Sequence, residues 1–254
     1  MKTFEEYGLY GMAAVTVIAT MNPKQNWAHN VFALGEDVLR AQLDTAFEGV
    51  GVDAAKSGML GSEYAVALTA EYIEKFAVSS YVLDPVMVCK GADEALNPEL
   101  NEAMAKKLLP LARVVTPNLF EAGQLAGVSA PASIDAMKKA AKAIFDKGAK
   151  NVFIKGGSKL HSADSSVKNS VDLLFDGKNF TLFESELLET AWTHGAGCTI
   201  SAAIAAGLAQ GKSVPEAVKT AKEFIAKSLN ASFALNKWVG PGNPSAWRKD
   251  RLFS

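Results

Sequence analysis

The sequence lacks the features that mark several classes of protein. Its 254 residues include only two cysteines, Cys89 and Cys198, which are too few for a disulfide framework and suit a reducing cytoplasm. Lysine and arginine together number 26 against 27 acidic residues, so no basic excess points to nucleic acid. No apolar run reaches the roughly 18 residues that a membrane span requires. We therefore expect a cytoplasmic protein that binds neither nucleic acid nor membrane.

The chain instead contains short apolar strands that alternate with helical patterns. Hydrophobic residues make up 49% of the sequence, enough to build a buried sheet with helices on both faces. The alternation is typical of βαβ units around a parallel sheet, and the length suits one α/β domain spanning residues 1–254. The predicted strands are 13–18, 52–56, 80–84, 114–116 and 151–155, with a hairpin formed by 171–175 and 179–183. The predicted helices are 37–48, 63–75, 99–108, 118–125, 133–147, 197–210 and 215–230.

The opening of the chain departs from this pattern. Residues 2–7 predict a helix, and a strand follows it. A doubly wound sheet normally starts with a strand. The order therefore predicts that a strand is missing in front of Met1.

The strongest local signal is the sequence Thr-His-Gly-Ala-Gly-Cys-Thr at residues 193–199. Gly195 and Gly197 flank Ala196 and lead into a helix of small residues, so backbone N–H groups and the helix dipole can point at one anion. Cys198 falls in the first turn of that helix, where the same field should lower its pKa. A tight turn with a buried cysteine fits the local residues equally well. A Walker A loop and a complete dinucleotide fingerprint are both absent from the sequence.

A second signal is the pair Asn118 and Glu121, which follows a predicted strand. The two residues are three apart and share a face near a helix N-terminus. An amide and a carboxylate placed there could hold a phosphate and hydrated Mg²⁺. The alternative is a capping box, in which the two side chains only satisfy the first backbone amides of the helix.

Two further signals lie where other strands end. Asp84 closes an apolar strand, the position at which open α/β sheets place ligand-binding groups, although it could also cap the next turn. Lys155 ends another strand and is followed by Gly156 and Gly157, so it could meet a nucleotide phosphate or simply be solvated. All four signals fall at strand ends or helix starts, which one crevice would bring together. Phosphoryl transfer needs mainly positioning and positive potential around the phosphate, and this set supplies both.

These residues resemble, in order, the bacterial hydroxymethylpyrimidine kinase and pyridoxine/pyridoxal kinase group of the ribokinase-like superfamily. The resemblance covers essentially the whole chain, including the motifs Tyr-Gly-Met at 10–12, Lys-Ser-Gly-Met-Leu at 56–60, Asp-Pro-Val-Met at 84–87, Thr-Pro-Asn-Leu-Phe-Glu at 116–121, Lys-Gly-Gly at 155–157 and Gly-Ala-Gly-Cys-Thr at 195–199. It implies a ribokinase-like three-layer α/β/α sandwich with a mostly parallel central sheet. It also implies ATP as co-substrate, Mg²⁺, and a homodimer.

The resemblance assigns phosphate-handling roles to residues already singled out. The turn 195–197 would form the anion hole for the γ-phosphate, and Cys198 would stand where most of the superfamily carries an aspartate base. Asn118 and Glu121 would position phosphate and Mg²⁺, and Asp84 would help to hold the metal. The residues implied to border the nucleotide are Lys155, Gly156 and Gly157.

Substrate contacts also follow from the resemblance. The residues implied are Gly11, Met21, Met59, Val86 and Cys89. Cys89 would lie on a lid, where it and the active-site cysteine can engage the pyridoxal aldehyde. Pyrimidine kinases of the group usually carry glutamine where Met21 stands here. Loss of an amide that reads a pyrimidine edge should lower the preference for pyrimidines, because a polar site discriminates better than an apolar one.

The expected function is therefore ATP-dependent phosphorylation of the hydroxymethyl group of pyridoxal, pyridoxine or pyridoxamine. One alternative is a hydroxymethylpyrimidine or hydroxymethylpyrimidine-phosphate kinase of thiamin biosynthesis. An alternative of another class is a non-catalytic vitamin-binding protein, since the resemblance implies a first strand and a Gly-Ser-Asp-rich substrate loop ahead of residue 2 that this sequence does not contain. Without them we expect a weakly active enzyme.

Overall fold

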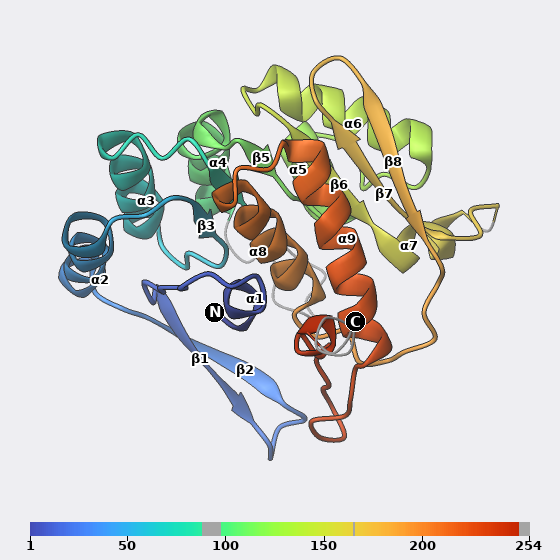
Figure 1. Ribbon diagram of the computed structural model, residues 1–254, viewed down its shortest axis with the longest axis horizontal. Helices are drawn as coiled ribbons and strands as arrows, with labels where there is room; N and C mark the ends of the chain where they lie inside the picture. The colour runs from blue at the N-terminus through green and yellow to red at the C-terminus, as the bar shows by residue number, and fades with distance from the viewer. Residues whose placement is uncertain (88–97, 165, 249–254) are drawn as a thin grey trace.

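The protein is built around a six-stranded mixed sheet (Figure 1). A computed structural model describes residues 1–87, 98–164 and 166–248. Four strands run parallel in the order β3-β4-β5-β6, and β7 and β8 extend the sheet as an antiparallel hairpin. The strands are β3 (Ala55–Ser57), β4 (Tyr81–Leu83), β5 (Val114–Val115), β6 (Val152–Gly156), β7 (Ser170–Phe175) and β8 (Phe180–Ser185).

Helices cover both faces of this sheet, and the strands alternate accordingly. Tyr81 and Leu83 of β4 join one core, whereas Val82 between them joins the other. The helices on the first face are α2 (Glu36–Asp44), α3 (Glu63–Lys75), α4 (Pro98–Lys107), α5 (Leu119–Ala126) and α6 (Ile134–Asp146), with a π-helical turn η1 (Thr45–Val50) and a 3₁₀ turn η2 (Leu109–Leu111). Those on the second face are α1 (Lys2–Glu6), α8 (Ala196–Ala209) and α9 (Val214–Asn230), which cross in front of the sheet in Figure 1. The three-layer α/β/α sandwich is confirmed.

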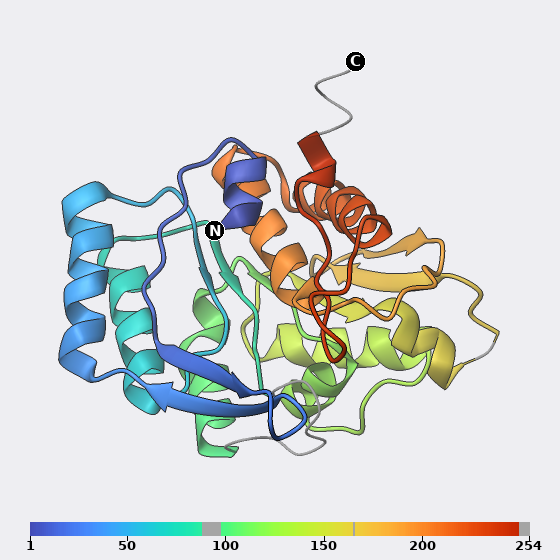
Figure 2. The ribbon, with the colours of Figure 1, turned by 90° about the horizontal axis from the view of Figure 1, so that it is seen from below.

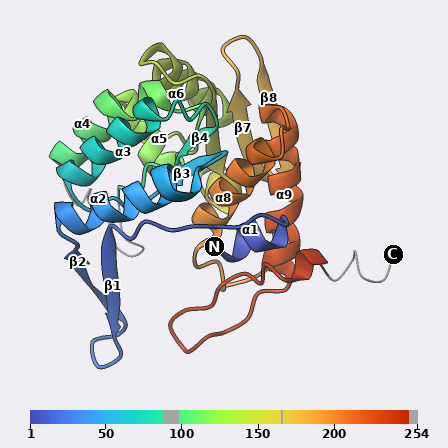
Figure 3. The same cartoon turned by 60° about the vertical axis from the view of Figure 1, so that its left-hand side comes forward.

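The segment 13–18 was predicted as a strand of the main sheet, and this is wrong. Its first half is irregular, because side chains take up its hydrogen bonds. The Gln42 side chain accepts from the Val15 amide and donates to the Val15 carbonyl, and the Thr16 hydroxyl donates to the Met59 carbonyl. The strand β1 (Val17–Asn22) begins later and pairs antiparallel with β2 (Ala28–Ala33) in a separate two-stranded sheet. Figure 3 shows this hairpin projecting away from the helical layers.

The tip of the β1–β2 hairpin is joined to the C-terminal part of the chain. Asn26 and Trp27 have φ values of 50° and 66°, which places the turn in the left-handed region. The Trp27 ring stacks on Trp238, with ring centroids 5.4 Å apart and planes at 17°. Figure 2 shows the hairpin tip beside the loop that carries Trp238. The same loop is bonded to the segment before α8, because the His194 amide donates to the Gly240 carbonyl.

The remaining predicted elements are present with shifted ends. The hairpin of β7 and β8 forms as expected around Asp176, whose carboxylate accepts from the amides of Lys178 and Asn179. Each predicted helix has a counterpart, although 37–48 divides into α2 and η1. The helix α7 (Gly157–Ala163) was not predicted. No helix among the described residues is long and apolar enough to cross a membrane.

Candidate active site

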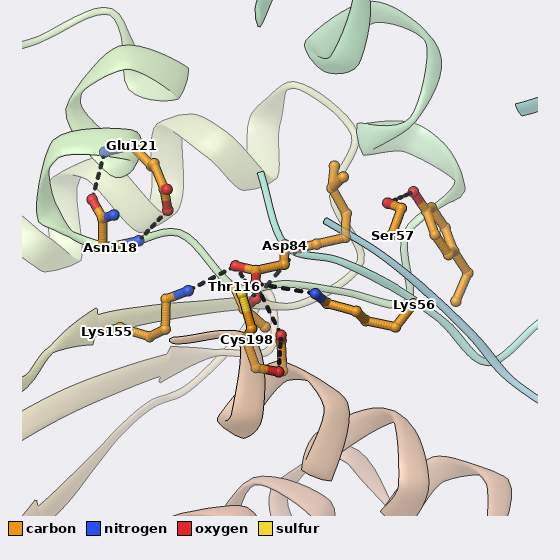
Figure 4. Close-up of polar contacts among 11 residues, drawn as sticks. Lys56, Ser57, Asp84, Thr116, Asn118, Glu121, Lys155 and Cys198 are labelled. Atoms are coloured by element: carbon orange, nitrogen blue, oxygen red, sulfur yellow. Dashed lines mark hydrogen bonds and ion pairs between the residues drawn. The ribbon is translucent and has the colours of Figure 1, made fainter. Parts of the chain in front are cut away.

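Asp84 is the centre of a buried network of charged and polar groups (Figure 4). Its residue surface is 1% exposed. One carboxylate oxygen lies 2.7 Å from the Lys155 ammonium and 3.3 Å from the Thr116 hydroxyl, and both groups can donate to it. The other oxygen accepts from the Ser201 hydroxyl at 3.0 Å and lies 3.4 Å from the Lys56 ammonium. Two cations and two hydroxyls thus surround one anion.

The topology of the sheet explains why these groups meet. Asp84 follows β4 directly, and its two strand neighbours are β3 and β5. Lys56 lies within β3, Thr116 follows β5, and Lys155 lies near the end of β6. Because the carboxyl ends of parallel strands meet at one edge of a sheet, residues distant in sequence converge there. Ser201 arrives from the first turns of α8.

The charges of this network hold one another in the ionised state. Burial alone would raise the pKa of Asp84, but Lys155 and Lys56 reverse this and hold its pKa below the ordinary value. Burial would likewise lower the pKa of Lys155, yet Asp84 and then Glu121 raise it. The prediction that Lys155 could be a solvated lysine is wrong, since its side chain is only 14% exposed.

Asn118 and Glu121 form the capping box that was one of their two predicted roles. The Asn118 side-chain oxygen accepts from the Glu121 amide at 2.9 Å, and the Glu121 carboxylate accepts from the Asn118 amide at 2.8 Å. Glu121 is nonetheless buried and close to the charged network. Burial first, then the negative charge of Asp84, raises its pKa to about 7 against the opposing effect of Lys155.

The turn before α8 has the geometry expected for an anion site. Gly195 is the N-cap residue with φ of 75°, a left-handed conformation that glycine adopts without strain. Gly197 and Cys198 follow in the first helical turn, whose amides have no partner within the helix. A methyl group at Gly197 would lie 3.3 Å from the Lys155 ammonium. The Lys155 ammonium therefore lies beside the start of the helix.

Cys198 occupies the predicted position, but the pKa of its thiol is shifted in the opposite direction from the one expected. It is the third residue of α8, and it lies on the wall of the cavity beside Gly195. Loss of hydration raises the pKa of its thiol, with Asp84 and Glu121 adding to the effect and Lys56 and Lys155 opposing it. The prediction of a lowered pKa is therefore wrong for the protein without ligand.

A cavity of about 1180 Å³ borders this turn. Its lining brings together Gly11, Met59, Gly195 and Cys198, which were predicted to lie around the substrate or the transferring phosphate. Lys56 also contributes to the wall. The predicted substrate residues Met21 and Val86 are not among the lining residues, since Met21 lies on β1 opposite His29 and Val86 follows Asp84. Cys89 lies outside the described residues.

The protein groups alone do not make a metal site. Within residues 1–87, 98–164 and 166–248, no cluster of three or more histidine, cysteine, aspartate or glutamate side chains could hold a metal ion. Both Asp84 oxygens already interact with lysine ammonium groups. Mg²⁺ usually retains waters and binds one or two carboxylates together with substrate phosphates. The arrangement fits such a shared site, with Glu121 as the carboxylate that carries no lysine partner at hydrogen-bonding distance in the described structure.

Three members of the network were not predicted from the residues. Lys56 and Thr116 belong to the motifs at 56–60 and 116–121, but no role was predicted for either residue. Ser201 lies outside the predicted motifs. A cation one residue from the end of β3 and a hydroxyl after β5 occupy positions where strand ends converge. Ser201 stands three residues after Cys198 on α8 and donates to its carbonyl as well as to Asp84. The convergence of strand ends was a usable signal for the first two.

The two helical layers, the mostly parallel sheet and the glycine turn beside buried lysines define a ribokinase-like small-molecule kinase. More particularly, residues 1–243 match the phosphomethylpyrimidine kinase family, and the chain belongs to that family. Over 248 residues it is 54% identical to the putative pyridoxine kinase of Treponema pallidum, covering 98% of this chain and 91% of that protein.

A solved structure agrees with this relationship. The chain matches the pyridoxal kinase from Staphylococcus aureus in complex with AMP-PCP and pyridoxal, with a TM-score of 0.89 and 45% identity, covering 98% of this chain and 87% of that one. Similarity to the hydroxymethylpyrimidine/phosphomethylpyrimidine kinase of Haemophilus influenzae is lower, at 38% identity over 252 residues, 99% of this chain and 91% of that protein. The pyridoxine kinases are thus the more similar group.

Replacement of Asp84 by asparagine should destabilise the fold strongly. The Asp84→Asn change leaves two buried ammonium groups without their anion, so we expect a loss of about 3–5 kcal/mol in the free energy of unfolding. Urea unfolding at neutral pH measures this. Glu71→Gln, which breaks the exposed pair with Arg40, is the matched control and should leave the unfolding midpoint unchanged. Equal midpoints for Asp84→Asn and wild type would contradict the role of Asp84.

Replacement of Glu121 by glutamine should change how stability depends on pH. The native pKa of Glu121 is about 7 and the ordinary value is 4.5, so the native state binds the extra proton between these values. Its contribution to stability is present below pH 4.5 and is lost as pH rises to about 7. Glutamine can keep the capping interaction but does not titrate. The stability of Glu121→Gln relative to wild type should therefore rise by up to roughly 3 kcal/mol across this window. Parallel curves from thermal unfolding at several pH values would contradict the assignment.

Proposed function

We propose that the protein transfers the γ-phosphate of ATP to the hydroxymethyl group of pyridoxal, pyridoxine or pyridoxamine. The observation that carries the proposal is the turn 195–197, where the start of α8 lies beside the Lys155 ammonium and borders a large cavity. Helix N-termini and lysines stabilise the charge of a transferring phosphoryl group. Similarity to a pyridoxal kinase solved with AMP-PCP and pyridoxal supports the choice of substrates.

In this proposal, each group has a defined task. The amides of the turn 195–197 bind the γ-phosphate, and Lys155 supplies positive charge beside it. Asn118 and Glu121 contact the phosphate and Mg²⁺ from the start of α5, and Mg²⁺, when bound, supplies charge neutralisation to the phosphate oxygens. Gly156 and Gly157 border the nucleotide.

Asp84 acts mainly by holding both lysines, while remaining close to the metal. Gly11 and Met59 line the cavity and contact the vitamin ring. The hydroxymethyl oxygen then attacks the γ-phosphorus in line as the bond to the β-phosphate oxygen breaks and ADP leaves, and the hydroxyl proton passes to the Cys198 thiolate.

A direct comparison of acceptors tests the proposed reaction. Purified protein is assayed with ATP and Mg²⁺ against pyridoxal, pyridoxine, pyridoxamine and hydroxymethylpyrimidine under identical conditions, with ADP release measured by a coupled assay. We expect kcat/KM to be highest for a vitamin B6 compound. A higher value for the pyrimidine would favour the thiamin-pathway kinase, and vitamin binding without ADP release would favour a non-catalytic binding protein.

Cys198 is proposed as the group that receives or orients the hydroxyl proton. Because the pKa of its thiol is raised in the protein without ligand, a thiolate base predicts that kcat increases with pH through the neutral range. Cys198→Ala should lower kcat by on the order of a hundredfold. Cys198→Asp carries a base of lower pKa, so the rise of its kcat should shift to lower pH. A Cys198→Ala enzyme with wild-type kcat would restrict Cys198 to binding.

We also propose that the enzyme is a cytoplasmic homodimer. The β1–β2 hairpin supports this, because it exposes Ile18, Val31 and Phe32 and a two-stranded sheet is marginally stable by itself. A reducing compartment suits the free Cys198 thiol. Light scattering should give twice the chain mass of 26.9 kDa, and Phe32→Ser should shift the protein toward the monomer. A monomeric wild type would contradict the proposal.

A further inference from the structure

A second buried ion pair lies away from Asp84, on the face of the sheet covered by α8 and α9. Asp172 of β7 lies 2.7 Å from the ammonium of Lys222 on α9, and the two side chains are 6% and 10% exposed. The neighbouring position on the same face, Leu174, belongs to the apolar core. A carboxylate and an amine therefore occupy a place where apolar side chains would pack.

Stability alone does not explain this pair. Removing two charges from water costs several kcal/mol per ion, and replacement of such a pair by well-packed apolar side chains is often neutral or stabilising. The pair has a further contact, however. The other oxygen of Asp172 accepts from the Gly157 amide at 2.9 Å.

Gly157 belongs to the turn that ends β6. Its φ of 51° is left-handed, and an added Cβ at Gly156 would lie 2.3 Å from the Val171 carbonyl. On the opposite side, the Lys155 amide donates to the Pro117 carbonyl at 2.8 Å. The segment 155–157 is thus fixed between the residues preceding α5 and the first residues of β7.

This segment determines where the Lys155 ammonium lies. The side chain reaches from the end of β6 to Asp84 at 2.7 Å and to within 3.3 Å of a Cβ built at Gly197. A small displacement of its main chain would therefore move the cation away from the turn before α8. Displacements of about 1 Å in a phosphoryl-transfer site can cost up to a hundredfold in rate.

We infer that Asp172 is a positioning residue for phosphoryl transfer, which holds the Gly156–Gly157 turn through the Gly157 amide while Lys222 neutralises and orients its carboxylate. This inference rests on the proposed kinase function and deepens it. Asp172 contacts neither the cavity beside Cys198 nor the Asp84 network. It acts through the main chain of the turn.

Two double variants separate positioning from stability. Lys222→Met/Asp172→Asn removes both charges but keeps a side-chain oxygen that can accept from the Gly157 amide. Lys222→Met/Asp172→Leu removes both charges and the acceptor, with nearly the same side-chain volume. The leucine variant should unfold at the same temperature as the asparagine variant or a higher one, because apolar packing replaces a buried amide. It should nevertheless show a KM for ATP raised about tenfold or more, with the KM for pyridoxal unchanged.

A purely structural control shows what loss of stability alone does. Leu174→Ala lies on the same strand and face and creates a core cavity, so its melting temperature should fall without a change in the KM for ATP. Hydrogen exchange of the peptide that contains Gly157, followed by mass spectrometry, gives a readout independent of turnover. Exchange there should be faster in the leucine variant than in the asparagine variant.

The outcomes distinguish the inference from the proposed function. Equal KM for ATP and equal exchange at Gly157 in the two double variants, with an active wild type, would overturn the role of Asp172 alone. A wild-type protein that phosphorylates no acceptor would overturn the proposed function, and this inference with it. A raised KM for ATP in Leu174→Ala equal to that of the leucine double variant would show that general destabilisation is the cause.

Discussion

The ionised carboxylate of Asp84 is the interaction on which the site depends. It lies between Lys56 and Lys155 with almost no exposure to solvent, and both lysines would be costly to bury without it. The carboxylate holds the Lys155 ammonium beside α8. It also binds the first turns of that helix, because it accepts from the Ser201 hydroxyl. The positive potential beside the glycine turn is thus a property of a network and not of one lysine.

The surrounding fold supplies each component from a different element. The charged side chains lie at the ends of strands, and the main-chain amides belong to the start of α8. The start of α5 contributes the carboxylate of Glu121, whose pKa is about 7. Beyond them, β7 and α9 fix the turn after β6 by a second ion pair. Two buried ion-pair systems, Asp84 with Lys56 and Lys155 and Asp172 with Lys222, thus lie on either side of the main chain at the end of β6.

The order of elements in the main sheet was predictable because parallel strands carry near-continuous apolar runs, as β4 and β6 do. The hairpin of residues 17–33 was not, because Ala28–Ala33 is mostly exposed and lacks a regular alternation of apolar and polar residues. Its pairing also depends on a turn with Asn26 and Trp27 in left-handed conformations. The glycine turn and Glu121 were placed correctly from local pattern. The direction of the Cys198 pKa shift was not, because it depends on the groups that the fold places around the sulfur.

The stacked rings of Trp27 and Trp238 have a mechanical consequence. Through Gly240 and the amide of His194, the loop that carries Trp238 is bonded to the segment immediately before Gly195. The exposed hairpin is therefore connected to the start of α8 by one ring stack and one backbone hydrogen bond. A molecule that contacts the hairpin would therefore contact a segment connected to the start of α8 through the Trp27–Trp238 stack and the hydrogen bond between His194 and Gly240.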